Sequence, residues 1–326
     1  MGTPTESFLH PALFYRDSDS YLAGTVPFVE AGLDAGEAVA VAVPGSRLAL
    51  LESALGAAAG RVRLIDMEQA GRNPGRIIPR ILRAFVDAHA GTRVRIVGEP
   101  IWAGRSAAEY AACAQHEALV NHAFTGREAT VLCPFDISRL DRQVLDDALA
   151  THPMIIEDDV PRSSPGYAPD TVVDAYNQPF SRPSGSPARG FDAMLLPDTR
   201  AFAVREAVAL GLPADRCEDL ALVVAELTTN SVIHGGGTGT LHIWAEGGDI
   251  VCEVEDAGHI ADPLAGRHIP PPGRPGGRGL LLVNYLTDLV RIHTTPTGTA
   301  VRCHLRLSPP PPSPAPDADA TAGRLR

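Results

Sequence analysis

The chain has 326 residues, an apolar fraction of 44% and a formal net charge of −11. Its length exceeds the ~250–300 residues at which a single hydrophobic core usually stops growing, so two domains are expected. The acidic balance argues against non-specific binding to nucleic acid or to anionic membranes, because both depend on basic protein surfaces. Proteins or small molecules are the expected partners.

The cysteines and the N-terminal residues narrow the class further. Five cysteines are widely scattered and none lies in a CxxC pair, so neither a disulfide framework nor a zinc site is expected. The chain does not open with a basic segment followed by an apolar one, and no stretch approaches ~18 uninterrupted apolar residues. We therefore expect a cytoplasmic protein with no membrane-spanning segment.

Residues 1–158 have the pattern of an α/β domain, in which short β-branched runs alternate with helical patterns. The predicted strands are Ala38–Val43, Val62–Asp66, Val94–Gly98, Thr130–Cys133 and Met154–Ile156. The predicted helices are Ser46–Ala59, Pro74–Ala90, Ala107–Phe124 and Arg139–Ala150. This alternation predicts a doubly wound, mostly parallel sheet.

The rest of the chain divides into three parts. Residues 159–187 are dense in Pro, Ser, Gly and Asp and are predicted to form a partly ordered linker. Residues 188–307 form a second predicted domain, with two helices, two strands, a Gly/Pro-rich excursion, one helix and two strands. Residues 308–326 are Pro-rich and of low complexity, so we expect them to be disordered.

A helix in the second domain carries a polar pair beside its apolar stripe. Glu226 and Asn230 are four residues apart, which places a carboxylate and an amide on one face. Such a pair can bind Mg²⁺ and polarise a hydroxyl, although an ordinary solvated Glu/Asn contact would show the same spacing. The helix is predicted to end at the glycines that follow His234.

Three glycine-containing signals follow that helix. Asp256 ends a predicted strand two residues before Gly258, which permits close approach of the backbone. The sequence GGRG then opens a helix at Gly279, and glycines before a helix offer free N–H groups to phosphate. The third signal is Gly298-Thr299, at the start of the last predicted strand. Each signal is weak alone, and their order and spacing are the specific feature.

Together, the Glu226/Asn230 pair and the three signals that follow it resemble the nucleotide-binding boxes of the GHKL superfamily, which includes histidine kinases and gyrase. The resemblance implies an α/β sandwich with a mixed sheet (the Bergerat fold) that binds ATP and Mg²⁺. By position, Asn230 would bind Mg²⁺ and Glu226 would be the general base. Asp256 would read the adenine amine, Gly258 would let the ring approach, and Thr299 would support the adenine end.

The phosphates would lie at the glycine loop. Gly277, Arg278 and Gly279 would contact them beneath a short lid at Ile260–Pro275. Arg267 and Arg274, in the lid, could neutralise phosphate charge, although an exposed loop arginine is more often only solvated. His234 lies at a helix C-terminus, where a positive charge favours the helix dipole, and is expected to have a structural role.

Within the superfamily, the chain looks most like the anti-sigma-factor serine kinases. The segment before the second domain is a Pro/Ser-rich linker without the phosphoacceptor helix of a histidine kinase, and no long transducer domain follows. The resemblance implies transfer of phosphate to a Ser of a STAS-type anti-sigma antagonist, sequestration of a sigma factor, and possible homodimers. The alternatives are a non-catalytic, ATP-gated anti-sigma binding module and an orphan histidine-kinase-like sensor.

The first domain is similar to MEDS sensory domains, through GLDAGEAVAVAVP, GEPIWAG, the His116-Glu117 pair with Asn121, and CPFD. The resemblance implies a RecA-like sheet that senses a small molecule, and its first β–α junction contains no P-loop. Glu99 and Trp102 follow a strand at the sheet edge where ligands bind, and His116 and Glu117 could reach the same crevice. Alternatively, Glu99-Pro100 is a turn and Trp102 is a half-buried packing residue. His116 and Glu117 would then lie on an ordinary polar helix face.

Overall fold

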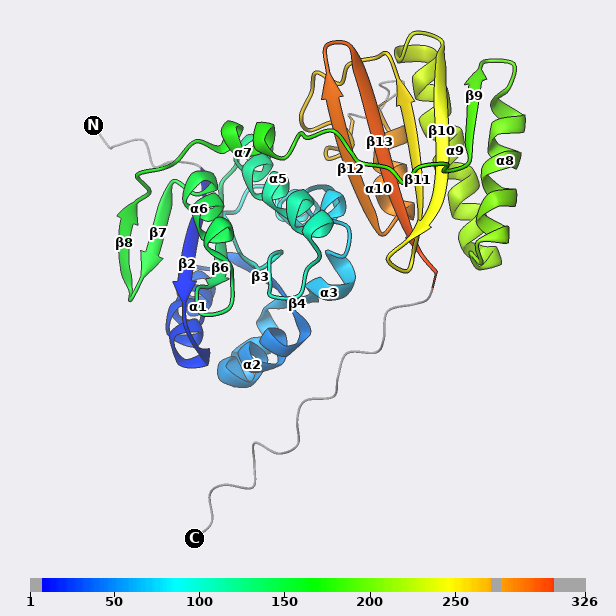
Figure 1. Ribbon diagram of the computed structural model, residues 1–326. Helices are drawn as coiled ribbons and strands as arrows, with labels where there is room; N and C mark the ends of the chain where they lie inside the picture. The colour runs from blue at the N-terminus through cyan, green and yellow to red at the C-terminus, as the bar shows by residue number, and fades with distance from the viewer. Residues whose placement is uncertain (1–7, 271–276, 308–326) are drawn as a thin grey trace.

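The computed structural model describes residues 8–270 and 277–307 (Figure 1). The tail expected to be disordered, residues 308–326, lies outside the described residues. So do residues 271–276, which include Arg274 and the end of the predicted lid.

The first domain is built on an eight-stranded sheet with the order β4-β3-β5-β6-β2-β7-β8, and β1 also pairs with β6. Its strands are β1 (Phe8–Leu9), β2 (Pro11–Tyr15), β3 (Ala38–Val43), β4 (Arg63–Asp66), β5 (Val94–Gly98), β6 (Ala129–Asp136), β7 (Met154–Glu157) and β8 (Val160–Ser163). Every pairing is parallel except β7 with β8. The predicted doubly wound, mostly parallel sheet is confirmed.

Helices cover both faces of this sheet. They are α1 (Ser18–Asp34), α2 (Gly45–Leu55), α3 (Met67–Ala70), α4 (Arg83–Ala88), α5 (Ala107–Ala123) and α6 (Arg142–Thr151), with short 3₁₀ helices η1 (Gly56–Arg61) and η2 (Pro74–Arg76) and a π-helical segment η3 (Ile77–Leu82). The valines of β3 pack in the core beneath α1 and α2, whereas Ala40 and Ala42 pack in the core beneath α4, α5 and α6. Both faces of β3 are therefore buried away from water, which is why its sequence is a continuous apolar run.

The single helix predicted over Pro74–Ala90 is divided into three pieces, η2, η3 and α4. Pro79 lies inside the π-helical piece. Because proline has no N–H to donate to the preceding turn, one hydrogen bond of a regular α-helical ladder is missing at Pro79, which favours the irregular π-helical turn there.

The segment predicted as a linker contains ordered structure. It includes part of the hairpin β7–β8 and the helix α7 (Pro169–Ala175), whose Val172 is buried against Ala114 and Ala118 of α5. The chain then crosses one face of the second sheet to reach β9 (Figure 1). Along this crossing Arg182 pairs with Glu253.

The second domain has a five-stranded sheet with the order β12-β13-β11-β10-β9. Its strands are β9 (Ala188–Asp192), β10 (Thr238–Glu246), β11 (Asp249–Asp256), β12 (Leu289–Thr295) and β13 (Gly298–Arg306), and its helices are α8 (Leu196–Ala209), α9 (Ala214–His234) and α10 (Gly279–Leu286). The helices cover the face opposite the crossing segment (Figure 1).

The prediction of a mixed second sheet is corrected, since all four pairings are antiparallel. The reason is connectivity. β10 and β11, and likewise β12 and β13, are joined by tight turns, and a tight turn can join only antiparallel neighbours. The sandwich of helices on one sheet is as expected.

The two domains meet at the edge strand β12 and at the end of α10. The Asn177 side chain pairs with the backbone of Thr294 in both directions, at 2.8 and 2.9 Å, which caps the exposed edge of β12. Asn73 is fully buried, and its Nδ2 donates to the carbonyl of Asn284 at 2.9 Å. Arg76 Nε donates to the same carbonyl at 2.8 Å. The first domain therefore holds the C-terminal carbonyls of α10.

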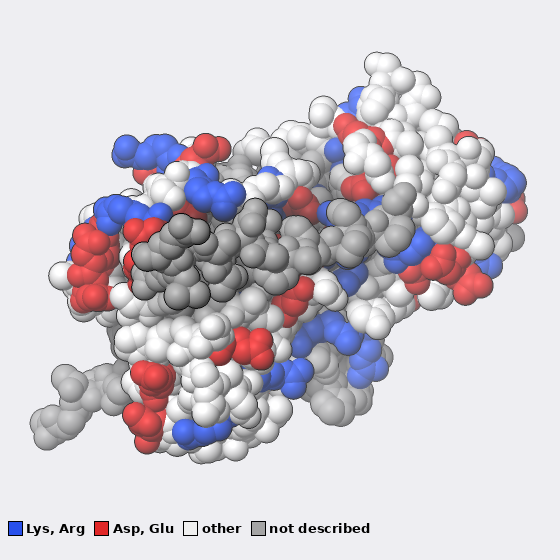
Figure 2. Space-filling model, turned by 90° about the horizontal axis from the view of Figure 1, so that it is seen from below, with Lys and Arg blue, Asp and Glu red and all other residues white. Residues whose placement is uncertain are grey.

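Among the described residues, no helix is both long and apolar enough to cross a membrane. On the face shown in Figure 2, acidic and basic side chains are interspersed and neither sign covers the surface.

Candidate functional site

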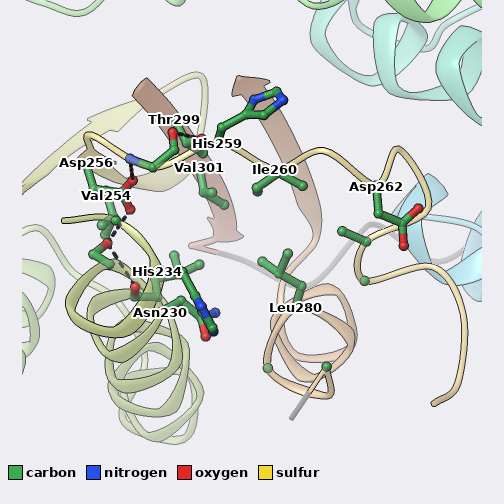
Figure 3. Close-up of a pocket in the computed structure, with 18 of the residues that line it drawn as sticks. Asn230, His234, Val254, Asp256, His259, Ile260, Asp262, Leu280, Thr299 and Val301 are labelled. Atoms are coloured by element: carbon green, nitrogen blue, oxygen red, sulfur yellow. Dashed lines mark hydrogen bonds between the residues drawn. The ribbon is translucent and has the colours of Figure 1, made fainter. Parts of the chain in front are cut away.

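A cavity of about 540 Å³ opens between α9, β11, β13 and the start of α10 (Figure 3). Its polar lining includes Asn230, Ser231, Asp256 and Thr299, and its apolar lining includes Leu227, Val254, Ile260, Leu280 and Val301. A concave site with an apolar wall and a few converging polar groups is typical of a small-molecule binding pocket.

The C-terminal half of α9 forms one side of the cavity. Its apolar stripe, including Leu220, Val224 and Leu227, is buried against the sheet, which fixes the rotation of the helix. Glu226 and Asn230 consequently point toward the start of α10. A Cβ placed on Gly279 would lie 2.6 Å from Glu226 Oε2 and 3.2 Å from Asn230 Nδ2. The glycine backbone therefore lies directly against this polar pair.

Asp256 is held in place at the end of β11. Its Oδ2 accepts a hydrogen bond of 2.6 Å from the Ser231 hydroxyl, and its Oδ1 accepts one of 2.8 Å from the Gly258 N–H. An ionised carboxylate has about four acceptor positions, so Asp256 keeps capacity for a ligand donor. The fixed carboxylate suits recognition of an amine in the cavity.

Gly258 lies where the strand end meets the end of α9. A Cβ at this position would lie 2.7 Å from the His234 carbonyl oxygen and 2.9 Å from the Gly235 Cα. Thr299 is nearly buried, and its hydroxyl donates to the Gly258 carbonyl at 2.8 Å. It also lies 2.8 Å from the Thr294 hydroxyl. The strand β13 thus clamps the Asp256–Gly258 turn.

In the first domain, Glu99 follows β5 and is 2% exposed. Its Oε1 accepts a hydrogen bond of 2.9 Å from the Tyr15 hydroxyl. Burial raises the pKa of Glu99 to about 8, against the lowering effect of Tyr15 and of the Arg47 charge. Trp102 is half-buried, and the Arg105 guanidinium stacks 3.8 Å from its ring centre.

His116 and Glu117 are 2% and 1% exposed, so the reading of an ordinary polar helix face is wrong. The reason is that α7 and the sheet cover α5 from two sides. Burial lowers the pKa of His116 to about 3. Glu117 contacts His10 and His152, whereas Glu99 contacts Tyr15. The two carboxylates therefore belong to different groups of side chains.

Comparison with protein families divides the chain in the same way. Residues 9–153 match the MEDS family, the methanogen/methylotroph, DcmR sensory domain, and residues 192–305 match the histidine kinase-like ATPase domain. The protein joins a MEDS domain to a histidine kinase-like ATPase domain. No curated protein matches the chain.

The chain also has similarity to two solved structures. The RsbU and RsbW domains of a Mycobacterium tuberculosis protein are 22% identical, with a TM-score of 0.29, and cover 38% of this chain. The histidine kinase AdeS of Acinetobacter baumannii is 10% identical, with a TM-score of 0.22, and covers 43% of this chain. The matches span 34% and 74% of those two chains, respectively.

The ATPase domain brings together most of the residues singled out in the sequence. Those that line the cavity are Asn230, Asp256, Gly258, Gly277, Gly279 and Thr299. Glu226 and Arg278 are not among the lining residues, and Arg278 is exposed. Arg267 donates to the Pro74 carbonyl of the MEDS domain at 3.4 Å instead of facing the cavity.

Several lining residues were not singled out in the sequence. Ser231 follows Asn230 directly, but its bond to Asp256 spans 25 residues, so no local pattern indicates it. His234 was expected to have only a structural role, yet it also lines the cavity (Figure 3). Val254, Leu280 and Val301 read as ordinary core residues, because an apolar pocket wall and a core have the same pattern.

Proposed function

We propose that the ATPase domain binds ATP with Mg²⁺ and transfers the γ-phosphate to a Ser hydroxyl on a STAS-type anti-sigma antagonist, and that the MEDS domain regulates this transfer. A sigma factor is the second proposed partner. The observation that carries the proposal is that Asp256 and Gly279 line one and the same cavity.

The adenine end of the proposed complex lies at Asp256. Its carboxylate would accept a hydrogen bond from the exocyclic amine, while Ser231 and the Gly258 N–H hold it in position. Gly258 and Thr299 complete this end of the cavity. Val254, Ile260 and Val301 supply apolar surface for a ring.

The phosphate end lies where the chain enters α10. Gly277 and Gly279 line the cavity, and the first N–H groups of a helix are free to bind phosphate oxygens. Asn230 offers an amide oxygen, a donor that suits Mg²⁺, which prefers a few protein oxygens together with phosphate and water. Bound Mg²⁺ would neutralise charge on the transferred phosphoryl group.

Glu226 is the proposed general base. It lies one helical turn before Asn230, and its Oε2 lies 2.6 Å from where a Cβ on Gly279 would be, so a hydroxyl approaching the γ-phosphate over the glycine loop would come within its reach. Accepting the hydroxyl proton is the role that a carboxylate at this end can perform.

Regulation would pass through α10. Asn73 and Arg76 of the MEDS domain hold the C-terminal end of this helix, and the N-terminal end opens at the phosphate loop. The Asn284 side chain also donates to the Gly266 carbonyl at 3.1 Å, and Gly266 lines the cavity. A ligand that shifts the MEDS domain would therefore move both the helix and part of the cavity wall.

The test is incubation of the purified full chain with labelled ATP and candidate STAS proteins. Phosphate should appear on a Ser of one partner, and Glu226→Gln should abolish the transfer while ATP still binds. Glu218→Gln, an exposed glutamate on the same helix, is the matched control and should behave like the wild type. Bound ATP with no transfer to any candidate would favour the ATP-gated binding module, in which Glu226→Gln leaves partner control intact.

A further inference from the structure

Four buried side chains converge in the MEDS domain, away from the nucleotide cavity. They are His10 between β1 and β2, Glu117 on α5, Cys133 on β6 and His152 directly after α6. None is more than 2% exposed, and one donor atom from each lies within 4.8 Å of all the others. The four come from distant parts of the sequence, so their convergence is a property of the fold.

Four of the six separations among these donor atoms are close to the edges of a tetrahedron around one metal ion. Glu117 Oε2 lies 3.2 Å from His10 Nε2 and 3.4 Å from His152 Nε2, and Cys133 Sγ lies 3.4 Å from His10 Nε2 and 3.5 Å from Glu117 Oε2. Tetrahedral zinc, with bonds of about 2.0–2.1 Å to N or O and about 2.3 Å to S, requires edges of about 3.3–3.4 Å and about 3.6 Å.

The outer contacts turn both imidazoles inward. Asn121 donates from Nδ2 to the Thr151 carbonyl at 2.8 Å, which leaves its Oδ1 to face His10 Nδ1 at 3.1 Å. His152 Nδ1 lies 2.9 Å from the Ala148 carbonyl. Because these oxygens only accept, each ring donates from Nδ1, which directs its Nε2 toward the centre. Ligation of this kind is the usual arrangement for a metal-binding histidine.

Two imidazole Nε2 atoms and the Cys133 sulfur therefore surround a carboxylate oxygen, an arrangement that suits a cation in its centre. Within the described part of the chain, His152 Nε2 and Glu117 Oε1 have no hydrogen-bond partner. The centres of the two imidazole rings lie 4.1 Å apart, so both rings line the same small space as the carboxylate.

We propose that His10, Glu117, Cys133 and His152 form a tetrahedral site for a divalent transition metal ion of the Zn²⁺ type. Two imidazoles, a thiolate and a carboxylate are ligands that favour Zn²⁺ over Mg²⁺ or Ca²⁺. The Cys133 thiol loses its proton to solvent as the metal–sulfur bond forms. The two anionic ligands then balance the charge of the ion, which leaves the buried site neutral.

Metal occupancy would also fix α5 at the domain interface. Glu117 lies on this helix, and its first turn contacts the ATPase domain through Arg291 with the Ala108 carbonyl and through Arg306 with Glu109. The site is therefore linked to the interface by one continuous helix.

The test uses the full chain without a histidine tag, stripped with a chelator and titrated with Co²⁺. The wild type should bind one ion, with the intense visible bands of tetrahedral Co²⁺ and a thiolate-to-metal charge-transfer band, and equimolar Zn²⁺ should abolish both. Cys133→Ser should lose the charge-transfer band. Cys113→Ser, another buried free cysteine, is the matched control and should keep it.

A second variant separates a lost ligand from a lost fold. Asn121→Ala keeps all four ligands but removes the partner of His10, so the affinity for Co²⁺ should fall about 10–100-fold while the bands remain. Circular dichroism checks that each variant is folded. A folded wild type that binds no Co²⁺, or a folded Cys133→Ser that keeps the charge-transfer band, would overturn the proposal.

Discussion

Gly258→Ala is the most direct perturbation of the proposed adenine end of the cavity. The new Cβ would lie 2.7 Å from the His234 carbonyl oxygen and 2.9 Å from the Gly235 Cα, whereas ordinary contact begins at 3.4 Å. Both neighbours are backbone atoms at the end of α9, so no side-chain rotation can relieve the overlap. The Asp256–Gly258 turn must move away from the helix by several tenths of an ångström.

The cost can be estimated from the packing. Overpacking of this kind destabilises a protein by about 1–3 kcal/mol, which is less than the ~5–15 kcal/mol stability of a typical domain, so the variant should still fold. If as little as 1.4 kcal/mol of this strain acts against the bound state, the affinity for nucleotide falls about tenfold.

The assay is titration of the full chain with ATP and Mg²⁺ by calorimetry, with thermal unfolding as a check on the fold. Gly190→Ala is the matched control, because a Cβ at this glycine on β9 meets nothing within 4 Å. Gly258→Ala should bind at least tenfold more weakly, and Gly190→Ala should bind like the wild type. Equal affinity in both variants would refute the role of close backbone approach.

Two further predictions concern the MEDS domain and its interface. Asn73→Ala removes the donor to the Asn284 carbonyl and the acceptor of the Gly75 N–H, so it should destabilise the protein by about 1–3 kcal/mol; an unchanged thermal midpoint would contradict this. Glu99→Gln should flatten the pH dependence of stability. Because the folded pKa of Glu99 is raised from 4.5 to about 8, its stabilising contribution is complete below pH 4.5 and is lost as pH rises toward 8. Thermal midpoints measured across that range test the effect, and a variant with the wild-type slope would exclude Glu99 as its source.

Much of the fold could be predicted because its signals are local. β3 and β5 have the predicted boundaries, and α5 ends within one residue of its prediction. By contrast, β2 lies between β6 and β7 in the sheet but was not predicted. Its sequence PALFY begins with proline and shows no alternation, since all five residues are buried. The burial of β2 depends on strands that are distant in the sequence, so no local pattern predicts this short strand.

The candidate sites show the same division. The order of the motifs around Asn230, Asp256 and Gly279 could be read along the chain, and the structure places these residues around one cavity. The group around His10 could not be read in this way, because spacing rules for zinc detect ligands that are close in sequence. His10 and His152 are separated by most of the MEDS domain, and only the fold brings them together.

The central proposal is that the Asp256 carboxylate binds the adenine of a nucleotide in the cavity of the ATPase domain. Calorimetric titration of the full chain with ATP and Mg²⁺, for the wild type and for Asp256→Ala, tests it most directly. We predict one bound nucleotide in the wild type and no measurable binding in a folded Asp256→Ala variant. Wild-type affinity in that variant, or no binding by the wild type, would contradict the account.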